Sequence, residues 1–225
     1  MIALLSRDML RRAIGLPVVW PSVILFLCAG SAQSQNSPVN YLFLLASGFL
    51  CDPGDSGNCP AVAKSPNGDT YEISGAGTFD PQNKFVKAAG TFNHKATNGT
   101  ILETGVWLAS ELISFDSYGV APSALSQRGP AFSIPQLGPK RPPMRPGSLP
   151  TGGLAIFRIL LVAVSGTSRE AVLEVNCALG DVPSQRSGEG IRLSLEQAKS
   201  EYSAELSGHV MFISMKPEKS PLAKP

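Results

Sequence analysis

The amino-acid sequence predicts an all-β protein, built as an antiparallel sandwich or a barrel-like meander with at most one short helix. Apolar and polar residues alternate with a period of two over several runs, which is typical of strands with one buried and one solvated face. Turn-forming residues such as Asp80-Pro81 and Asn98-Gly99 separate these runs. Glycine and proline contribute 22 and 19 of the 225 residues, which favours many turns over long helices.

Two neighbouring runs carry the alternation most clearly. The first run places its apolar and glycine residues on one face, namely Tyr71, Ile73, Gly75, Gly77 and Phe79. The second run does the same with Val86, Ala88, Gly90, Phe92 and His94. A Gly-Thr-Phe triplet occurs in both, at 77–79 and 90–92, and predicts adjacent strands whose glycines allow their backbones to approach closely. Farther along, residues 101–115 change phase, and we expect a bulge or bend at Gly105.

The amino terminus has the layout of a bacterial secretion signal. Basic residues at Arg7, Arg11 and Arg12 precede an apolar stretch, 18–27, and then a run of small residues, 29–32. We therefore expect residues 1–33 to be removed and the mature chain to be secreted or periplasmic. No other apolar run is long enough for a transmembrane span.

The charge balance of the mature chain argues against nucleic acid as a partner. Removal of residues 1–32 takes away three arginines and one aspartate, which leaves 16 basic and 16 acidic side chains. Nucleic-acid affinity depends on clustered lysine and arginine, and a neutral chain offers no such excess.

The mature chain divides into two parts of one predicted β domain, 34–118 and 154–215. Between them lies a proline-rich, basic segment, 119–153, which we interpret as a loop or linker and, alternatively, as a docking segment for a protein partner. The tail, 216–225, is predicted to be disordered. Ser194 and Gln197 match a capping box, and apolar residues then follow at helical spacing, so the one short helix is expected over 195–206.

Three cysteines remain in the mature chain. Cys51 and Cys59 flank a loop containing proline and glycine, so a disulfide between them is the preferred pairing in an oxidising compartment. Cys177 has the parity of a buried strand face and would then be a free thiol. The alternative pairs Cys177 with one of the other two cysteines.

No group of residues reaches a catalytic, cofactor-binding or metal-binding signature, and we expect no cofactor. Gly54-Asp55-Ser56-Gly57 is similar over four residues to the nucleophile loop of chymotrypsin-like serine proteases, but both histidines, His94 and His209, follow it in the chain. We interpret this loop as a turn closed by the disulfide. The oxygen-bearing side chains of the same loop match no calcium-binding spacing, and the two histidines match no zinc-binding spacing.

One charged side chain interrupts an apolar strand. Arg158 lies within 154–165, where an unpaired guanidinium would be costly to bury. We expect it to reach the sheet edge or to meet a carboxylate, with Glu103, Glu111 and Glu174 as candidates. If Arg158 and His94 both faced the interior of a barrel, they would mark a pocket.

The sequence therefore favours an exported, non-catalytic β-rich protein of the envelope or cell surface, or a binding protein. One alternative is a small-molecule binder or isomerase that uses a barrel lumen. Another is an assembly or adhesion component that docks through residues 119–153.

Overall fold

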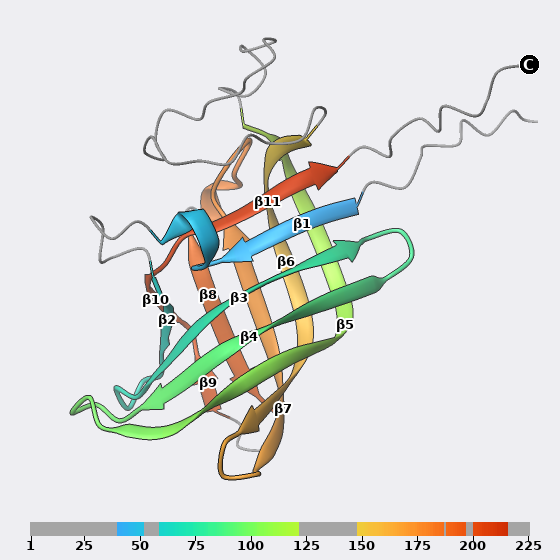
Figure 1. Ribbon diagram of the computed structural model, residues 1–225. Helices are drawn as coiled ribbons and strands as arrows, with labels where there is room; N and C mark the ends of the chain where they lie inside the picture. Colours follow the sequence, from blue (N-terminus) through green and yellow to red (C-terminus); the bar gives the residue numbers. More distant parts are fainter. Residues whose placement is uncertain (1–39, 52–58, 122–147, 187, 197–199, 216–225) are drawn as a thin grey trace, which may run out of the picture. The chain divides into compact units, whose positions relative to one another are not determined.

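The computed structural model describes residues 40–51, 59–121, 148–186, 188–196 and 200–215, and all of these belong to one compact unit. The described residues form eleven strands and two short 3₁₀ helices (Figure 1). In chain order these are β1 (Asn40–Leu45), η1 (Gly48–Leu50), β2 (Ala61–Lys64), β3 (Thr70–Asp80), β4 (Phe85–Lys95), β5 (Ile101–Val120), β6 (Ser148–Ala163), β7 (Ser168–Cys177), η2 (Ser184–Arg186), β8 (Gly190–Leu195), β9 (Ser200–Tyr202), β10 (Ala204–Ser207) and β11 (Val210–Met215).

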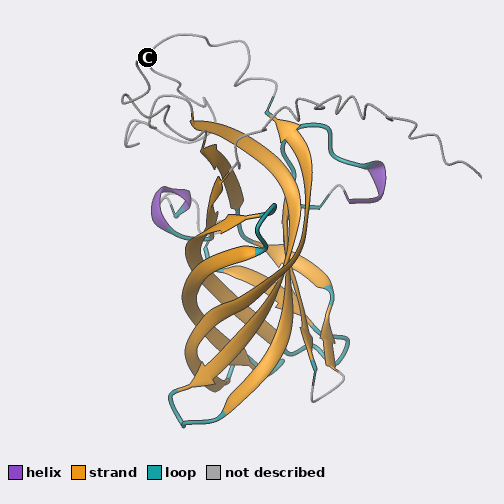
Figure 2. Ribbon diagram, turned by 90° about the vertical axis from the view of Figure 1, so that its right-hand side faces the viewer, coloured by secondary structure: helices purple, strands orange, loops and turns teal. Residues whose placement is uncertain are grey.

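All pairings in this sheet are antiparallel, and six of its strands form a closed ring. Backbone hydrogen bonds lead from β3 through β4, β5, β6, β11 and β1 and back to β3. Figure 2 shows the strands curving around a common interior. The predicted all-β fold is therefore confirmed, and the ring makes it barrel-like.

At two places in the sheet, two short strands lie one after the other where a single long strand would fit. β1 and β2 lie end to end along the same edge of β3, with Leu45 opposite Gly75 and Ala61 opposite Ile73. β11 and β10 continue this arrangement, because β11 pairs with β1 and β10 pairs with β2. The chain between β1 and β2 therefore leaves the sheet and returns to it, and this excursion carries η1 and the disulfide. The remaining strands β7, β8 and β9 extend from β6, and β8 lies beside β2 and β10.

The middle of the ring is filled by aromatic side chains. Phe43 of β1 is fully buried and contacts four other rings at centroid distances of 5.3–6.4 Å. These four are Phe79, Trp107, Phe157 and Phe212, which come from β3, β5, β6 and β11. The interior at this level is a packed core, since each of the five rings is at most 1 % exposed.

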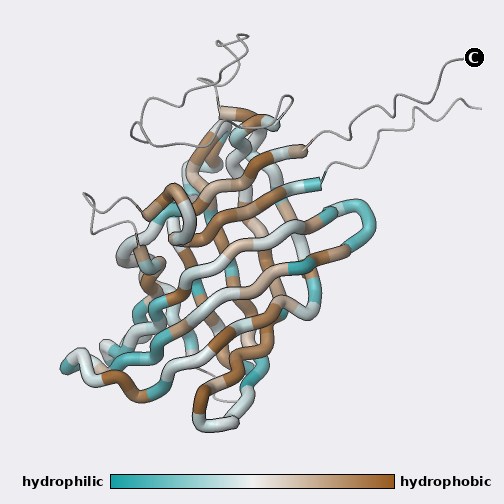
Figure 3. The backbone as a smooth tube through the Cα atoms, viewed as in Figure 1, coloured by the Kyte–Doolittle hydropathy of each residue, from teal (hydrophilic) through white to brown (hydrophobic). Residues whose placement is uncertain are grey.

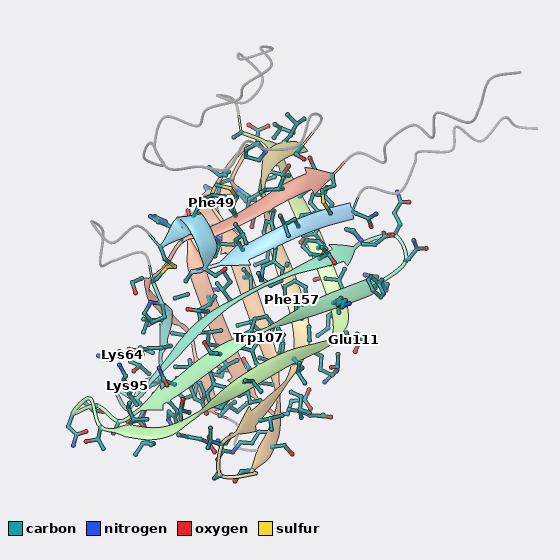
Figure 4. All side chains as sticks on the ribbon, viewed as in Figure 1. Phe49, Lys64, Lys95, Trp107, Glu111 and Phe157 are labelled. Atoms are coloured by element: carbon teal, nitrogen blue, oxygen red, sulfur yellow. A yellow bond between two sulfur atoms is a disulfide. The ribbon has the colours of Figure 1, made fainter. Side chains whose placement is uncertain are left out.

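The indole of Trp107 packs against β3 and β4 at a point where each of these strands has a glycine (Figure 4). Gly75 and Gly90 are direct cross-strand partners on the inner face. A Cβ atom on Gly75 would lie 2.3 Å from the indole Cζ2, and one on Gly90 would lie 2.5 Å from the indole Nε1. The indole N–H donates a hydrogen bond to the Ser74 carbonyl oxygen at 3.1 Å. Gly90 begins the second Gly-Thr-Phe triplet, and Gly75 lies two residues before the first. These two glycines thus allow the close approach of adjacent strands that the sequence predicted.

β5 changes phase at three points, and none of them is Gly105. Its register with β6 shifts between Ala109 and Glu111, and again in the intervals 112–114 and 117–119. Gly105 keeps its register and is a point of close contact, because a Cβ there would lie 2.1 Å from the Val162 carbonyl oxygen. The predicted phase change is real, but its expected position was wrong.

The predicted helix over 195–206 is absent from the described part of that segment. β8 extends to Leu195, and the chain then forms β9 over 200–202 and β10 over 204–207. Tyr202 is 5 % exposed and lies opposite Leu193 of β8, so pairing with β8 and burial of this ring determine the local structure. Structure also begins earlier than expected after the proline-rich segment, at Ser148 instead of Leu154, and β5 extends to Val120 before it.

We predict that Gly90→Ala destabilises the protein far more than Gly99→Ala. A Cβ on Gly90 would lie 1.9 Å from the Ser74 carbonyl oxygen, so two strands must separate, and we expect a loss of about 3 kcal/mol or more. Gly99 has open space around it and a φ of +83°, so its substitution costs only conformational strain, about 1 kcal/mol. Urea unfolding of both variants measures the difference, and equal losses would contradict the close approach.

Candidate functional site

Five inward-facing side chains form a polar layer at one end of the aromatic core. The polar end layer consists of Tyr71 (β3), His94 (β4), Glu103 (β5), Arg169 (β7) and Tyr202 (β9). The sheet register brings the first three together, because Tyr71 lies opposite His94 and His94 lies opposite Glu103. Arg169 has the same parity as the buried residues Ala171 and Leu173, so it faces inward at the start of β7.

Aromatic contacts hold one side of the polar end layer. The imidazole of His94 stacks on the Tyr71 ring, with centroids 4.5 Å apart and an interplanar angle of 8°. Tyr202 meets Tyr71 edge to face at 4.8 Å, and its hydroxyl oxygen lies 3.3 Å from His94 Nε2. A neutral ring with Nε2 unprotonated accepts the hydroxyl proton of Tyr202, which fixes the orientation of both side chains.

An ion pair holds the other side. Two guanidinium nitrogens of Arg169 donate to the two carboxylate oxygens of Glu103, at 2.5 Å and 3.2 Å. Bidentate pairing of this kind is charge-assisted and directional. The Glu103 side chain is only 13 % exposed, so its carboxylate is held inside the layer. Because the two opposite charges of the pair cancel, the pair adds no net charge to the layer.

The Tyr71 hydroxyl is the exception in this layer. Tyr71 is fully buried, and its hydroxyl interacts with the Arg169 guanidinium but makes no hydrogen bond of normal geometry with any of the described residues, so its proton has no acceptor there. Burial, together with the nearby Tyr202, raises the pKa of Tyr71 to about 12, although the positive charge of Arg169 and its hydrogen bond to the phenol act in the opposite direction. At neutral pH Tyr71 is therefore a protonated phenol and carries a hydrogen-bond donor.

His94 is held in its neutral form. Burial lowers the pKa of this imidazole, while the carboxylates of Asp69 and Glu103 act to raise it. Burial also raises the pKa of Tyr202. Asp69 belongs to the turn before β3, where its Oδ1 accepts a hydrogen bond from the Thr97 backbone N–H at 3.1 Å. Two turns at this end are thereby fixed to each other.

The structure separates the two residues that the sequence suggested as a pocket. His94 faces inward in the polar end layer, whereas Arg158 alternates with the buried Phe157 and Ile159 and so lies on the outer face of β6. Arg158 forms ion pairs with Glu111 and Glu196, so one of its three predicted carboxylate candidates is a partner. Figure 4 shows Glu111 apart from Lys95, the neighbour of His94 in β4.

The disulfide and the free thiol are where the sequence placed them. Cys51 and Cys59 are joined, with their Cα atoms 5.5 Å apart. Cys177 is a free thiol, fully buried at the end of β7, and burial raises its pKa to about 12, so it is an inert core residue. The serine and the oxygen-bearing side chains of the loop between the paired cysteines, 52–58, lie outside the described residues, as does most of the proline-rich segment.

Sequence reasoning placed Tyr71 on the inner face but missed Arg169 and Tyr202 as members of the site. Extending the alternation of β7 by one step from Ala171 would have placed Arg169 inside. His209, the second histidine, lies elsewhere, with Nδ1 3.3 Å from a carboxylate oxygen of Glu189.

Comparison with known proteins gives no further information on the site. No protein-family model, no curated protein and no solved structure matches this chain. Among the described residues there is no cluster of three or more histidine, cysteine or acidic side chains arranged to hold a metal ion. The described part of the chain also contains no helix that is long and apolar enough to cross a membrane.

We predict different outcomes for the removal of two buried tyrosine hydroxyls. The Tyr118 hydroxyl hydrogen-bonds to Asn176 Oδ1 at 2.9 Å, so Tyr118→Phe leaves a buried amide oxygen without this bond and costs about 1–2 kcal/mol. Tyr71→Phe removes a buried hydroxyl whose contact with Arg169 lacks normal hydrogen-bond geometry, so the free energy of unfolding should be nearly unchanged. Denaturant unfolding of the two variants tests this, and a Tyr71→Phe loss as large as that of Tyr118→Phe would reveal a partner.

A second prediction concerns pH. Because burial lowers the pKa of His94 in the folded protein, the unfolded chain binds this proton more readily. The free energy of unfolding should therefore fall as the pH is lowered below the ordinary value of 6.5, until the folded-state pKa is reached. In His94→Gln this contribution is absent, and urea midpoints measured across the window should depend less on pH. An identical pH dependence in both proteins would show that His94 does not contribute.

Proposed function

We propose that this protein is exported to the periplasm or to the outside of the cell and acts there as a non-catalytic binding protein. In this proposal its ligand site is the polar end layer, and the ligand is a small uncharged molecule with a hydrogen-bond acceptor. The proposed export rests on the signal-like amino terminus and is supported by the Cys51–Cys59 disulfide, which suits an oxidising compartment.

The single observation that carries the binding proposal is the buried Tyr71 hydroxyl. Native proteins give almost every buried polar group a hydrogen-bond partner, and an exception calls for an explanation. A ligand oxygen that accepts a hydrogen bond from this phenol would complete the layer. The raised pKa of Tyr71 favours this role, since the phenol keeps its proton throughout the physiological range.

The charge balance of the layer supports an uncharged ligand. The bidentate pairing with Glu103 neutralises Arg169, and His94 is neutral because burial lowers its pKa. A charged ligand would lose its hydration without gaining an opposite charge, which is costly. A carbonyl or hydroxyl oxygen next to a small apolar body fits the aromatic surroundings better.

The same contacts favour binding over catalysis. His94 Nε2 is engaged by Tyr202, its ring face is covered by Tyr71, and the Glu103 carboxylate is held by Arg169. A general base needs a free lone pair directed at a substrate proton. Neither of these groups offers one in this arrangement.

We predict that small oxygen-bearing probes bind at the polar end layer and that Tyr71→Phe weakens this binding. The probes are cyclohexanone and benzamide, each compared with an isostere that lacks the acceptor, methylenecyclohexane and α-methylstyrene. Backbone amide chemical shifts should change at β3, β4 and β9 on addition of cyclohexanone or benzamide. The loss of one buried hydrogen bond should lower affinity by roughly tenfold in Tyr71→Phe.

Tyr118→Phe is the matched control, because it loses stability while the polar end layer stays intact and should bind as the unmodified protein does. If neither oxygen-bearing probe changes these shifts, or if Tyr71→Phe binds them as well as the unmodified protein, the proposed ligand class is wrong.

A further inference from the structure

The outer surface of β5 and β6 breaks the pattern seen on neighbouring strands. On β3 and β4 the outward-facing residues are mainly polar, as Glu72, Thr78 and Lys87 illustrate. On β5 and β6 many of them are aliphatic, although Thr104 lies between Leu102 and Val106 and Arg158 lies next to Leu160 on the outer face. We call the aliphatic set the outer apolar face; its members are Leu102, Val106, Leu108, Leu160, Val162 and, just beyond β6, Val164. Brown segments on these strands in Figure 3 mark the same region.

This face is continuous and exposed. Val106 lies directly opposite Val162, and Leu108 lies opposite Leu160, so two apolar cross-strand pairs stand side by side. Leu102, Val106 and Leu108 are 55 %, 47 % and 47 % exposed, and Val164 is 82 % exposed. Together these side chains present roughly 500 Å² of apolar surface, within the range of the largest patches on monomeric proteins, which are often functional.

The geometry limits what can cover this face. β5 and β6 are each hydrogen-bonded along both edges at this level, so a partner cannot add a strand here. The inner side of the same strands is also filled, with Trp107 and Leu161 buried. A partner must therefore pack another flat apolar surface onto the face, as two sheets do in a sandwich.

The face ends beyond Leu160 at Arg158, which is paired with Glu111 and Glu196, and each of its two margins carries one exposed charge of opposite sign. On the β4 side, Ala89 and Thr91 border Leu108 and Val106, and the exposed Lys87 follows. On the β7 side, the exposed Glu170 lies opposite Leu160. A twofold axis parallel to the strands would place the β4 margin of one copy over the β7 margin of the other, and so bring Lys87 towards Glu170 twice.

We propose that the outer apolar face binds a second copy of this chain in a twofold-symmetric, face-to-face dimer. The charges on the two margins are complementary under a twofold axis, which is what an isologous interface requires. A standard stable interface buries roughly 800 Å² per copy, so the dimer contact must include the polar margins as well as the apolar face. This proposal is independent of the ligand site, which lies on the inner face.

The test measures the mass of the processed protein by sedimentation equilibrium between about 1 and 100 µM, a range that covers weak and moderate dimers. We expect a dimer whose dissociation constant rises at least tenfold in Leu108→Lys. The control is Asn40→Lys, which places the same charge at an exposed position of β1, away from the face and its margins, and should leave the dimer unchanged. Trp107 fluorescence checks that each variant is folded.

A charge exchange then tests the symmetry. Lys87→Glu and Glu170→Lys should each weaken the dimer several-fold, and the double variant should recover most of the loss because the two charges still face each other across the interface. A double variant that stays as weak as the two single variants would overturn the twofold arrangement.

A protein that remains monomeric over the whole range would overturn the proposal. This holds equally if the monomer then floats with vesicles of phosphatidylcholine and phosphatidylglycerol, which would assign the face to a lipid surface instead.

Discussion

The packing of the Trp107 indole on the glycine pair of β3 and β4 is the constraint on which the rest of the structure depends. Gly75 and Gly90 leave the space that the indole fills, and the indole N–H satisfies the Ser74 carbonyl oxygen of the strand below it. Phe43 rests on the same tryptophan and joins it to the rings of β6 and β11. One packing arrangement thus links the close approach of β3 and β4, the aromatic core and the closure of the ring. Because aromatic rings fill the middle of the interior, the polar side chains lie at one end of it, in the polar end layer.

Strict alternation allowed β3 and β4 to be predicted from sequence, because each presents one face to the core and one to solvent along its whole length. The Cys51–Cys59 pairing and the buried Cys177 were also predictable, since loop length and strand parity are local properties. The position of the bulges in β5 was not predictable. Bulges adapt a strand to neighbours that are distant in sequence, so the information lies in the closed ring and not in the strand itself.

The helix predicted over 195–206 was wrong for a simple physical reason. Residues four apart share a face in a helix and also in a strand, so the spacing of residues 198, 202 and 206 fits both. Pairing with β8 decides between them, and no local signal carries that pairing. The candidate site was only partly predictable for the same reason. The alternation predicted that Tyr71 and His94 share one inner face. It did not predict that β7 and β9 lie beside them, or that Arg158 faces outward.

The first and last described strands are hydrogen-bonded to each other along their whole length, with Asn40 opposite Met215 and Leu45 opposite Val210. Closure of the ring therefore joins the two ends of the described chain, and such non-local pairing slows folding. A growing polypeptide cannot complete this seam until its final strand has left the ribosome. The topology itself thus makes the last of the described strands to be synthesised the one on which closure of the fold depends.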